Sequence, residues 1–233
     1  MMTLLLDPPS APLLPRLLVA ALLVSAAGTV AAERIDVGQF SQGILDHWEA
    51  EEFSGITEYH LEADAEHGTV LGAQSQGAAS GLFRELDLDL NVTPWLHWSW
   101  KVNNLLQGAD ERTKAGDDYP ARIYVVFSGG MFFWKTRALN YVWSSHQAVD
   151  TEWPNAYTGN ARMIAVQSAA TSPGQWRNEV RDVRADYRRQ FGEEPGKVAA
   201  VAIMTDTDNT GQTAKAWYGD IWFSESATKT VSK

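Results

Sequence analysis

The sequence VAAVAIMTDTDNTGQTAKAWYGDIWFS, residues 198–224, contains an apolar strand, a loop of Asp, Thr, Asn and Gly, and a second strand rich in aromatic residues. Many β-sandwich domains end in this order of elements. The order places a polar loop, which is a candidate ligand site, between two buried strands. The stretch therefore predicts an all-β chain.

Alternation of apolar and polar residues extends the β prediction upstream. In WLHWSWKV, residues 95–102, the side chains of Leu96, Trp98 and Trp100 share one face and the polar side chains share the other. A half-buried strand has this period of two. The same reasoning predicts further strands at residues 122–127, 138–143 and 161–168.

One segment follows a helical period instead. Its apolar residues recur at spacings of four, three, four and four: Trp176, Val180, Val183, Tyr187 and Phe191. An amphipathic helix has this spacing, and Gly192 follows as a stop signal. We therefore predict a single helix near residues 175–191, laid across one edge or end of the sandwich.

The first 32 residues differ in composition from the rest. An apolar core at residues 17–24 is followed by the small residues Val30, Ala31 and Ala32, a pattern typical of a signal peptide and its cleavage site. The apolar run is shorter than the roughly 20 residues that a membrane-spanning helix needs. We therefore expect a signal peptide at residues 1–32, a single β-sandwich domain at residues 33–233, and a periplasmic or secreted protein with no membrane span after cleavage.

The composition limits the partners. Because nucleic acids and anionic membranes bind proteins through dense Lys and Arg, the formal net charge of −10 argues against both and favours a neutral or cationic partner. The chain has no cysteine, which excludes disulfides, thiolate metal sites, cysteine nucleophiles and a lipid-modified cysteine. Its ten tryptophans indicate either a thick aromatic core or a surface that stacks on sugar rings.

The polar loop matches the first half of a calcium-binding loop. Asp206, Asp208 and Thr210 supply oxygen at positions one, three and five, and Gly211 stands at position six. Trp217 occupies position twelve, where an EF-hand has a glutamate, so an EF-hand is excluded. A looser calcium site at Asp206, Asp208 and Thr210 is one interpretation, and calcium is the one cofactor suggested. The other is that these side chains bond the backbone of their own turn.

Two adjacent carboxylates precede a predicted strand. Asp117 and Asp118 could bind a cation, or one of them could have a raised pKa and act as a general acid. Neighbouring residues on a strand point to opposite faces, so a shared catalytic geometry is not expected. The alternative is a structural role in which one carboxylate pairs with Arg122 or caps the loop.

Three tryptophans near predicted turns are candidates for stacking on sugar rings. Trp134, Trp143 and Trp153 offer large aromatic faces, while Asp, Asn and Arg can bond sugar hydroxyls. The alternative for Trp143 is a core position, because it shares a strand face with Leu139 and Tyr141. No HExxH, GxSxG, Walker or dinucleotide-binding pattern is present, so the sequence carries no catalytic signature.

Five motifs occur in order along the chain: GDDYPARIYVVF (116–127), ALNYVW (138–143), NAYTGNARMIAVQS (155–168), EVRDVRADYRRQFG (179–192) and AVAIMTDTDNTGQTAKAWYGDIWF (200–223). With these motifs the chain resembles the bacterial family named domain of unknown function 3047. The resemblance implies an exported jelly-roll β-sandwich similar to galactose-binding-like modules, and it implies no activity. The positions that it highlights are Asp117, Asp118, Arg122, Asn140, Tyr141, Trp143, Asn155, Tyr157, Arg181, Asp186, Tyr187, Arg188, Asp206, Asp208, Asn209, Trp217 and Asp220.

Three functions are compatible with the sequence. The first is a noncatalytic module that binds a carbohydrate or another small polar ligand through Asp117, Asp118 and Arg122, with stacking from the tryptophans. The second is a polysaccharide hydrolase or lyase with paired carboxylates, in which Asp118 acts with a second acid. The candidates for that second acid are Glu152, Asp206 and Asp220. The third is an envelope scaffold that binds another protein.

Overall fold

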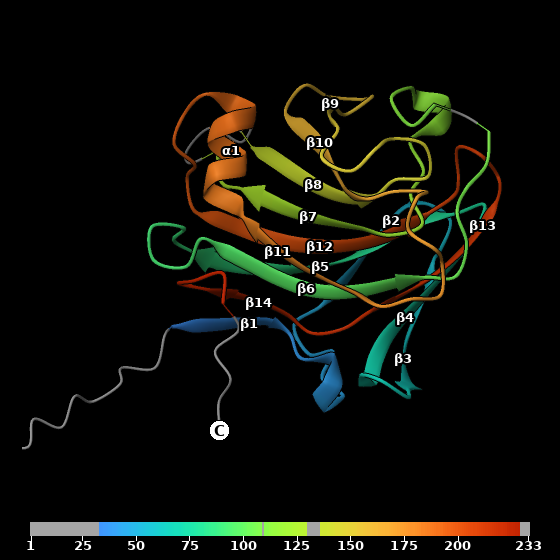
Figure 1. The fold of residues 1–233 in the computed structure, drawn as a ribbon, viewed down its shortest axis with the longest axis horizontal. Helices are drawn as coiled ribbons and strands as arrows, with labels where there is room; N and C mark the ends of the chain where they lie inside the picture. The colour runs from blue at the N-terminus through green and yellow to red at the C-terminus, as the bar shows by residue number, and fades with distance from the viewer. Residues whose placement is uncertain (1–32, 109, 130–135, 229–233) are drawn as a thin grey trace, which may run out of the picture. The chain divides into compact units, whose positions relative to one another are not determined.

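A computed structural model describes residues 33–108, 110–129 and 136–228 of the chain. The predicted signal peptide at residues 1–32 and the candidate stacking residue Trp134 lie outside this part. The described strands form two sheets, which face each other in Figure 1. We call them sheet A and sheet B.

Each sheet has seven strands in the described part of the chain. Sheet A follows the order β1 (Arg34–Gly38), β14 (Ile221–Ser224), β6 (Trp95–Val102), β13 (Thr213–Tyr218), β4 (Gly68–Gln76) and β3 (Glu58–Asp64), and β11 (Arg177–Asp182) also pairs with β6. Sheet B follows the order β2 (Glu49–Ser54), β5 (Ala79–Leu88), β12 (Val198–Asp206), β7 (Arg122–Phe127), β8 (Arg137–Trp143), β10 (Ala161–Gln167) and β9 (Glu152–Pro154). The described helices are α1 (Val183–Phe191) and two short 3-10 turns, Phe40–Gln42 and Lys114–Gly116.

Eight of these strands define the topology. In sheet A they follow the order β11, β6, β13 and β4, and in sheet B the order β8, β7, β12 and β5, with every neighbouring pair antiparallel. Along the chain, the eight strands cross between the sheets in the manner of two Greek keys, which is the arrangement of a jelly roll. The predicted all-β jelly-roll sandwich is therefore confirmed.

Aromatic side chains fill the space between the sheets. Leu96, Trp98 and Trp100 of β6 are all buried, as the alternation predicts. The Trp98 and Trp100 rings meet edge to face with centroids 5.4 Å apart, and Trp100 contacts Trp143 at 5.8 Å. Most of the driving force for the fold comes from burying such apolar area.

Trp143 and Trp153 do not form a stacking platform. Trp143 is fully buried in the core between the sheets, which is the alternative that its strand position indicates. Trp153 is 6% exposed, because β9 pairs with β10 at the edge of sheet B and places the ring against Tyr119 and Met163. Both rings are therefore buried, which favours a structural role for them over stacking on a sugar ring.

The predicted helix is shorter than its apolar spacing indicates. The helix spans Val183–Phe191, whereas the preceding residues form strand β11, which pairs with β6. Backbone hydrogen bonds to a neighbouring strand override the local helical period. Val180, a member of the predicted apolar face, is 36% exposed on this strand.

The start of α1 is set by Asp182. Its side chain accepts a hydrogen bond of 2.9 Å from the backbone N–H of Ala185, so it acts as the N-cap. Gly192 ends the helix in the left-handed region, with φ of 71°, as its position in the sequence predicts. The helix packs at one end of the sandwich, where Tyr187 contacts Phe127 of β7 (Figure 1).

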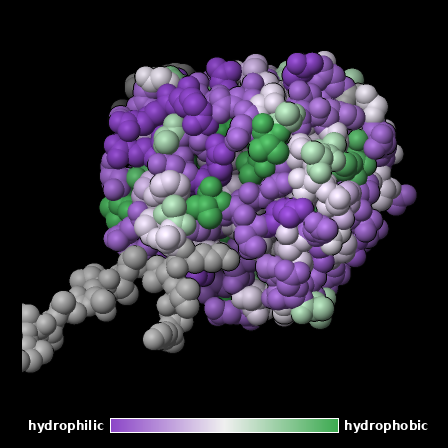
Figure 2. All heavy atoms as spheres, in the orientation of Figure 1, coloured by the Kyte–Doolittle hydropathy of each residue, from purple (hydrophilic) through white to green (hydrophobic). Residues whose placement is uncertain are grey.

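The surface on the viewed side is largely polar. Figure 2 shows a viewed face that is mostly hydrophilic, with hydrophobic side chains in small separate groups. Of the helices that the structure describes, none has the length and apolar character needed to cross a membrane.

The cap of α1 can be tested by mutation. Asp182→Ala removes the acceptor for the Ala185 N–H and should lower the free energy of unfolding by about 1 kcal/mol, measured by urea denaturation. Asp182→Asn keeps an acceptor and should stay within a few tenths of a kcal/mol of the wild type. Equal stability of the Ala variant and the wild type would contradict this assignment.

Candidate functional site

A pocket of about 410 Å³ lies on the outer face of sheet B, away from the core. Alternation along β7 sends Ile123 into the core and turns Arg122 and Tyr124 to this outer face. On neighbouring strands, Asn140 pairs with Tyr124 and Met204 pairs with Arg122. These four outward-facing side chains form the floor of the pocket.

Loops and an edge strand form the walls. Asp117 comes from the loop before β7, Asn155 and Tyr157 from the segment after β9, and Asp208 from the loop after β12. Phe53 of β2 stands on the opposite rim. Phe53 and Tyr157 are 66% and 55% exposed, so two aromatic rings face solvent at the entrance.

Arg122 is the central group of the floor. Its side chain is almost fully buried and donates a hydrogen bond of 2.7 Å to Asp206. A second carboxylate, Asp117, lies 3.9 Å from the guanidinium, and the rings of Tyr119 and Tyr124 each lie 5.1 Å from it. Because a buried charge is costly when it is unpaired, Arg122 fixes the positions of both carboxylates.

Asp118 holds the loop that follows β12. Its two carboxylate oxygens accept hydrogen bonds from the backbone N–H groups of Asn209, at 3.2 Å, and Thr210, at 2.7 Å. Gly211 completes the turn with φ of 69°. The loop backbone is therefore capped by a residue far away in the sequence. Thr210, predicted as a calcium ligand, supplies its N–H to this contact.

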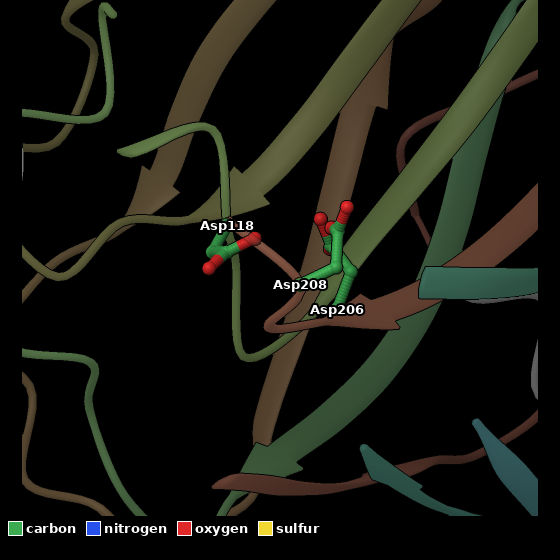
Figure 3. Close-up of side chains that lie close together, drawn as sticks. All are labelled: Asp118, Asp206 and Asp208. Atoms are coloured by element: carbon green, nitrogen blue, oxygen red, sulfur yellow. The ribbon is translucent and has the colours of Figure 1, made fainter. Parts of the chain in front are cut away.

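Asp118, Asp206 and Asp208 together form a carboxylate cluster. One oxygen from each lies within 4.8 Å of the others. Figure 3 shows Asp118 facing the other two from across a gap. The predicted acidic pair and the predicted calcium loop, about 90 residues apart in the chain, thus meet at one place.

Burial and crowding disfavour the ionised carboxylates. Burial raises the pKa of Asp206 well above its usual value; the Arg122 guanidinium opposes this rise, and Asp118, Asp117 and Asp208 add to it. Burial, followed by the negative charge of Asp118, also raises the pKa of Asp208. Burial raises the pKa of Asp117, against the opposing effect of Arg122. The raised pKa values show that Arg122 alone does not offset the burial and mutual repulsion of these carboxylates.

Several buried polar atoms at the pocket have no partner. Both polar side-chain atoms of Asn140, Nε of Arg122 and Oδ1 of Asp206 make no hydrogen bond with any described residue. Asn140 is fully buried and lines the pocket. Because buried polar groups are nearly always hydrogen-bonded, these atoms mark positions where a ligand or water would bond.

An apolar groove of about 440 Å³ continues from the pocket along the outer face of sheet B. It shares Phe53, Tyr124 and Met204 with the pocket. Phe83 of β5 and Val126 of β7 extend its lining. The outer face of sheet B thus has a polar end and an apolar end.

The structure separates the predicted site residues into groups. Asp117 and Arg122 line the pocket, Asp118 joins the carboxylate cluster beside it, and Trp143 and Trp153 lie in the interior. None of the described residues that line the pocket is a tryptophan.

Sequence reasoning did not identify two aromatic residues that line the pocket, Tyr124 and Phe53. The sequence does contain a signal for Tyr124: it lies two positions after the predicted site residue Arg122, so the two side chains share one face of the strand. The sequence contains no such signal for Phe53. It lies on the edge strand β2, where every residue is exposed and the apolar residues do not line one face.

The alternative acid partners of Asp118 lie elsewhere. Glu152 accepts hydrogen bonds from Arg189, and Asp220 accepts from the backbone and side chain of Ser41. Asp206 is near Asp118, but it is bonded to Arg122, and both oxygens of Asp118 accept backbone N–H groups. These carboxylates are thus engaged in structural contacts, and the geometry does not favour an acid and nucleophile pair.

Sequence comparison gives one family. The model of the family described as "Protein of unknown function (DUF3047)" matches residues 46–222, which span most of the sandwich. No curated protein matches the chain.

Solved structures share the sandwich architecture at low identity. The family 11 carbohydrate-binding module of the cellulosomal cellulase Lic26A-Cel5E of Clostridium thermocellum has a TM-score of 0.47 and 10% identity, over 86% of this chain and 99% of that one. The CBM22-1 xylan-binding domain of Xyn10C from Paenibacillus barcinonensis has a TM-score of 0.37 and 12% identity, over 84% of this chain and 95% of that one. Similarity at this level concerns the fold alone.

The pairing of Arg122 with Asp206 predicts a large loss of stability when it is broken. Asp206→Asn leaves a buried guanidinium without its closest anion, and this loss outweighs the relief of the burial and repulsion that raise the pKa of Asp206. The free energy of unfolding should therefore fall by about 3 kcal/mol, measured by urea denaturation. Asp208→Asn, in the same cluster but without a bond to Arg122, is the matched control and should not destabilise the protein. A wild-type stability for Asp206→Asn would show that the pair does not hold the site together.

For Asp208 we predict the opposite change: replacing it should increase the stability of the fold, by an amount that depends on pH. Because its pKa is raised in the folded state, its ionised form weakens folding, so Asp208→Asn should be more stable than the wild type at pH 7 to 8. This advantage should shrink as the pH falls through the raised pKa and vanish below about 4, where Asp208 is protonated in both states. Urea unfolding of both proteins across this range measures it; an advantage that grows on acidification would reject the assignment.

Proposed function

The chain is a member of the DUF3047 family, and from the pocket on sheet B we propose that it binds a carbohydrate or another small polar ligand without transforming it. Binding sites for small molecules are concave, with an apolar lining and a few convergent polar groups. The volume of about 410 Å³ lies in the range of such sites.

The observation that carries this proposal is the set of unpartnered polar atoms. Asn140 offers a donor and an acceptor, and Arg122 offers a further donor, at a place that solvent or a ligand must satisfy. An amide beside a guanidinium suits a ligand that carries several hydroxyl groups, because each hydroxyl both donates and accepts. Asn155, which donates to Asp117 at the wall, adds a further amide.

Aromatic rings at the pocket supply the apolar contact that a sugar ring requires. Phe53 and Tyr157 are exposed at the rim, and Tyr124 lies on the floor. Such rings bury the apolar face of a pyranose while polar groups bond its edge. These rings, in place of the tryptophans, are the proposed stacking residues.

The proposal extends to the location of the protein. The apolar segment and small-residue cleavage pattern at residues 1–32 support export to the periplasm or the exterior. Such a location would bring the pocket into contact with polysaccharides of the envelope or surroundings.

The rim aromatic residue gives a direct test. We expect a glycan array followed by isothermal titration calorimetry to identify a bound glycan, and Phe53→Ala to weaken its affinity about tenfold, or 1.4 kcal/mol. Val92→Ala is the matched control, since Val92 is also an exposed apolar residue but lies outside the pocket. No binding across the array and a panel of small polar ligands, or an equal loss in both variants, would overturn the proposal.

A further inference from the structure

We infer that the ligand carries a protonated amine, as in an amino sugar, and that the carboxylate cluster binds this ammonium group. The inference deepens the proposed function and rests on it. It assigns the polar end of the pocket to the charged group and the aromatic rim to the body of the ligand.

The charges at the pocket are unbalanced. Asp117, Asp118, Asp206 and Asp208 bring four carboxylates together, and Arg122 is the one cation among the described lining residues. That guanidinium is already bonded to Asp206. A cationic ligand would supply the missing positive charge, in line with the net charge of −10 of the whole chain.

One further cation lies near the rim. The ammonium of Lys114 stands 5.0 Å from the centre of the Tyr157 ring. It does not line the pocket, and none of the ion pairs between described residues joins it to the cluster. The excess of carboxylates at the polar end is therefore unchanged.

The geometry of the cluster suits an ammonium group. An atom at the centre of three oxygens that lie within 4.8 Å of one another is at most about 2.8 Å from each, the length of a hydrogen bond from an ammonium to a carboxylate. A protonated primary amine has three N–H donors, one for each of Asp118, Asp206 and Asp208. The unpartnered Oδ1 of Asp206 is an acceptor ready for one of them.

A calcium ion fits this set of oxygens less well. Calcium takes six to eight oxygen ligands. Each oxygen of Asp118 already accepts one backbone N–H group, and Oδ2 of Asp206 is bonded to Arg122, so the cluster keeps acceptor sites for three N–H donors but falls short of six oxygen ligands.

The remaining lining residues suit the body of an amino sugar. Phe53, Tyr124 and Tyr157 surround the pocket with aromatic rings, which attract the CH groups beside a positive charge as well as the ring face of a sugar. Asn140 and Asn155 are placed for hydroxyl groups. A neutral sugar would use these contacts but would leave the carboxylates without a counter-charge.

Two oligosaccharides provide the test, one with a free, protonated amine and one in which the amine is acetylated and neutral. Glucosamine and N-acetylglucosamine oligomers of equal length and linkage are titrated into the protein by calorimetry at pH 6, where the amine is protonated, in buffer with a chelator. We expect the glucosamine oligomer to bind at least tenfold more tightly. Asp208→Asn should remove most of this preference, whereas Glu58→Gln, an exposed acid on sheet A, should leave it intact.

Each outcome separates the two proposals. Equal affinity for both oligomers, or a preference that survives Asp208→Asn, overturns the amine assignment and leaves the binding function standing. Failure of both oligomers, together with silence of the glycan array, overturns the binding function itself. A melting temperature that rises with calcium in the wild type but not in Asp208→Asn, without any amine preference, would show that the cluster is a metal site and would overturn the inference.

Discussion

The buried Arg122 guanidinium is the constraint on which the site depends. A charge placed beneath the outer face of a sheet needs nearby anions; Asp206 provides one from the end of β12, and Asp117 provides the other from the loop before β7. The loop before β7 and the loop after β12 must therefore converge, and this convergence brings Asp118 against the backbone of residues 209 and 210. One ion pair thus links the jelly-roll strand order to the shape of the pocket.

The same pairing creates the electrostatic character of the pocket. Neutralising one guanidinium does not require four carboxylates. Burial raises the pKa of Asp206 and Asp208, and repulsion from the neighbouring carboxylates adds to the rise. Buried polar groups with a purely structural role form hydrogen bonds with one another. The side-chain oxygen and nitrogen of Asn140, however, have no hydrogen-bond partner among the described residues. Surplus charge and unsatisfied polar atoms in one cavity are features of a site that a ligand completes.

Local patterns predicted the strands well, because a period of two places Trp98 and Trp100 in the core whatever the partner strand is. They failed for the segment that precedes α1, because pairing with β6 is a non-local interaction that a helical spacing does not reveal. Asp117, Asp118, Arg122 and the 206–211 loop were each recognised as chemically notable. Their meeting depends on β12 lying beside β7, and that strand order is not written in any single segment.

The central claim is that the outer face of sheet B, at the carboxylate cluster, binds the ligand. Amide chemical shifts recorded by NMR during titration with a glucosamine oligomer test this location most directly. The account predicts the largest shifts at the backbone N–H groups of Asn209 and Thr210, which bond Asp118, and at the side-chain amide of Asn140. Shifts confined to the outer face of sheet A, around Trp217, would contradict it.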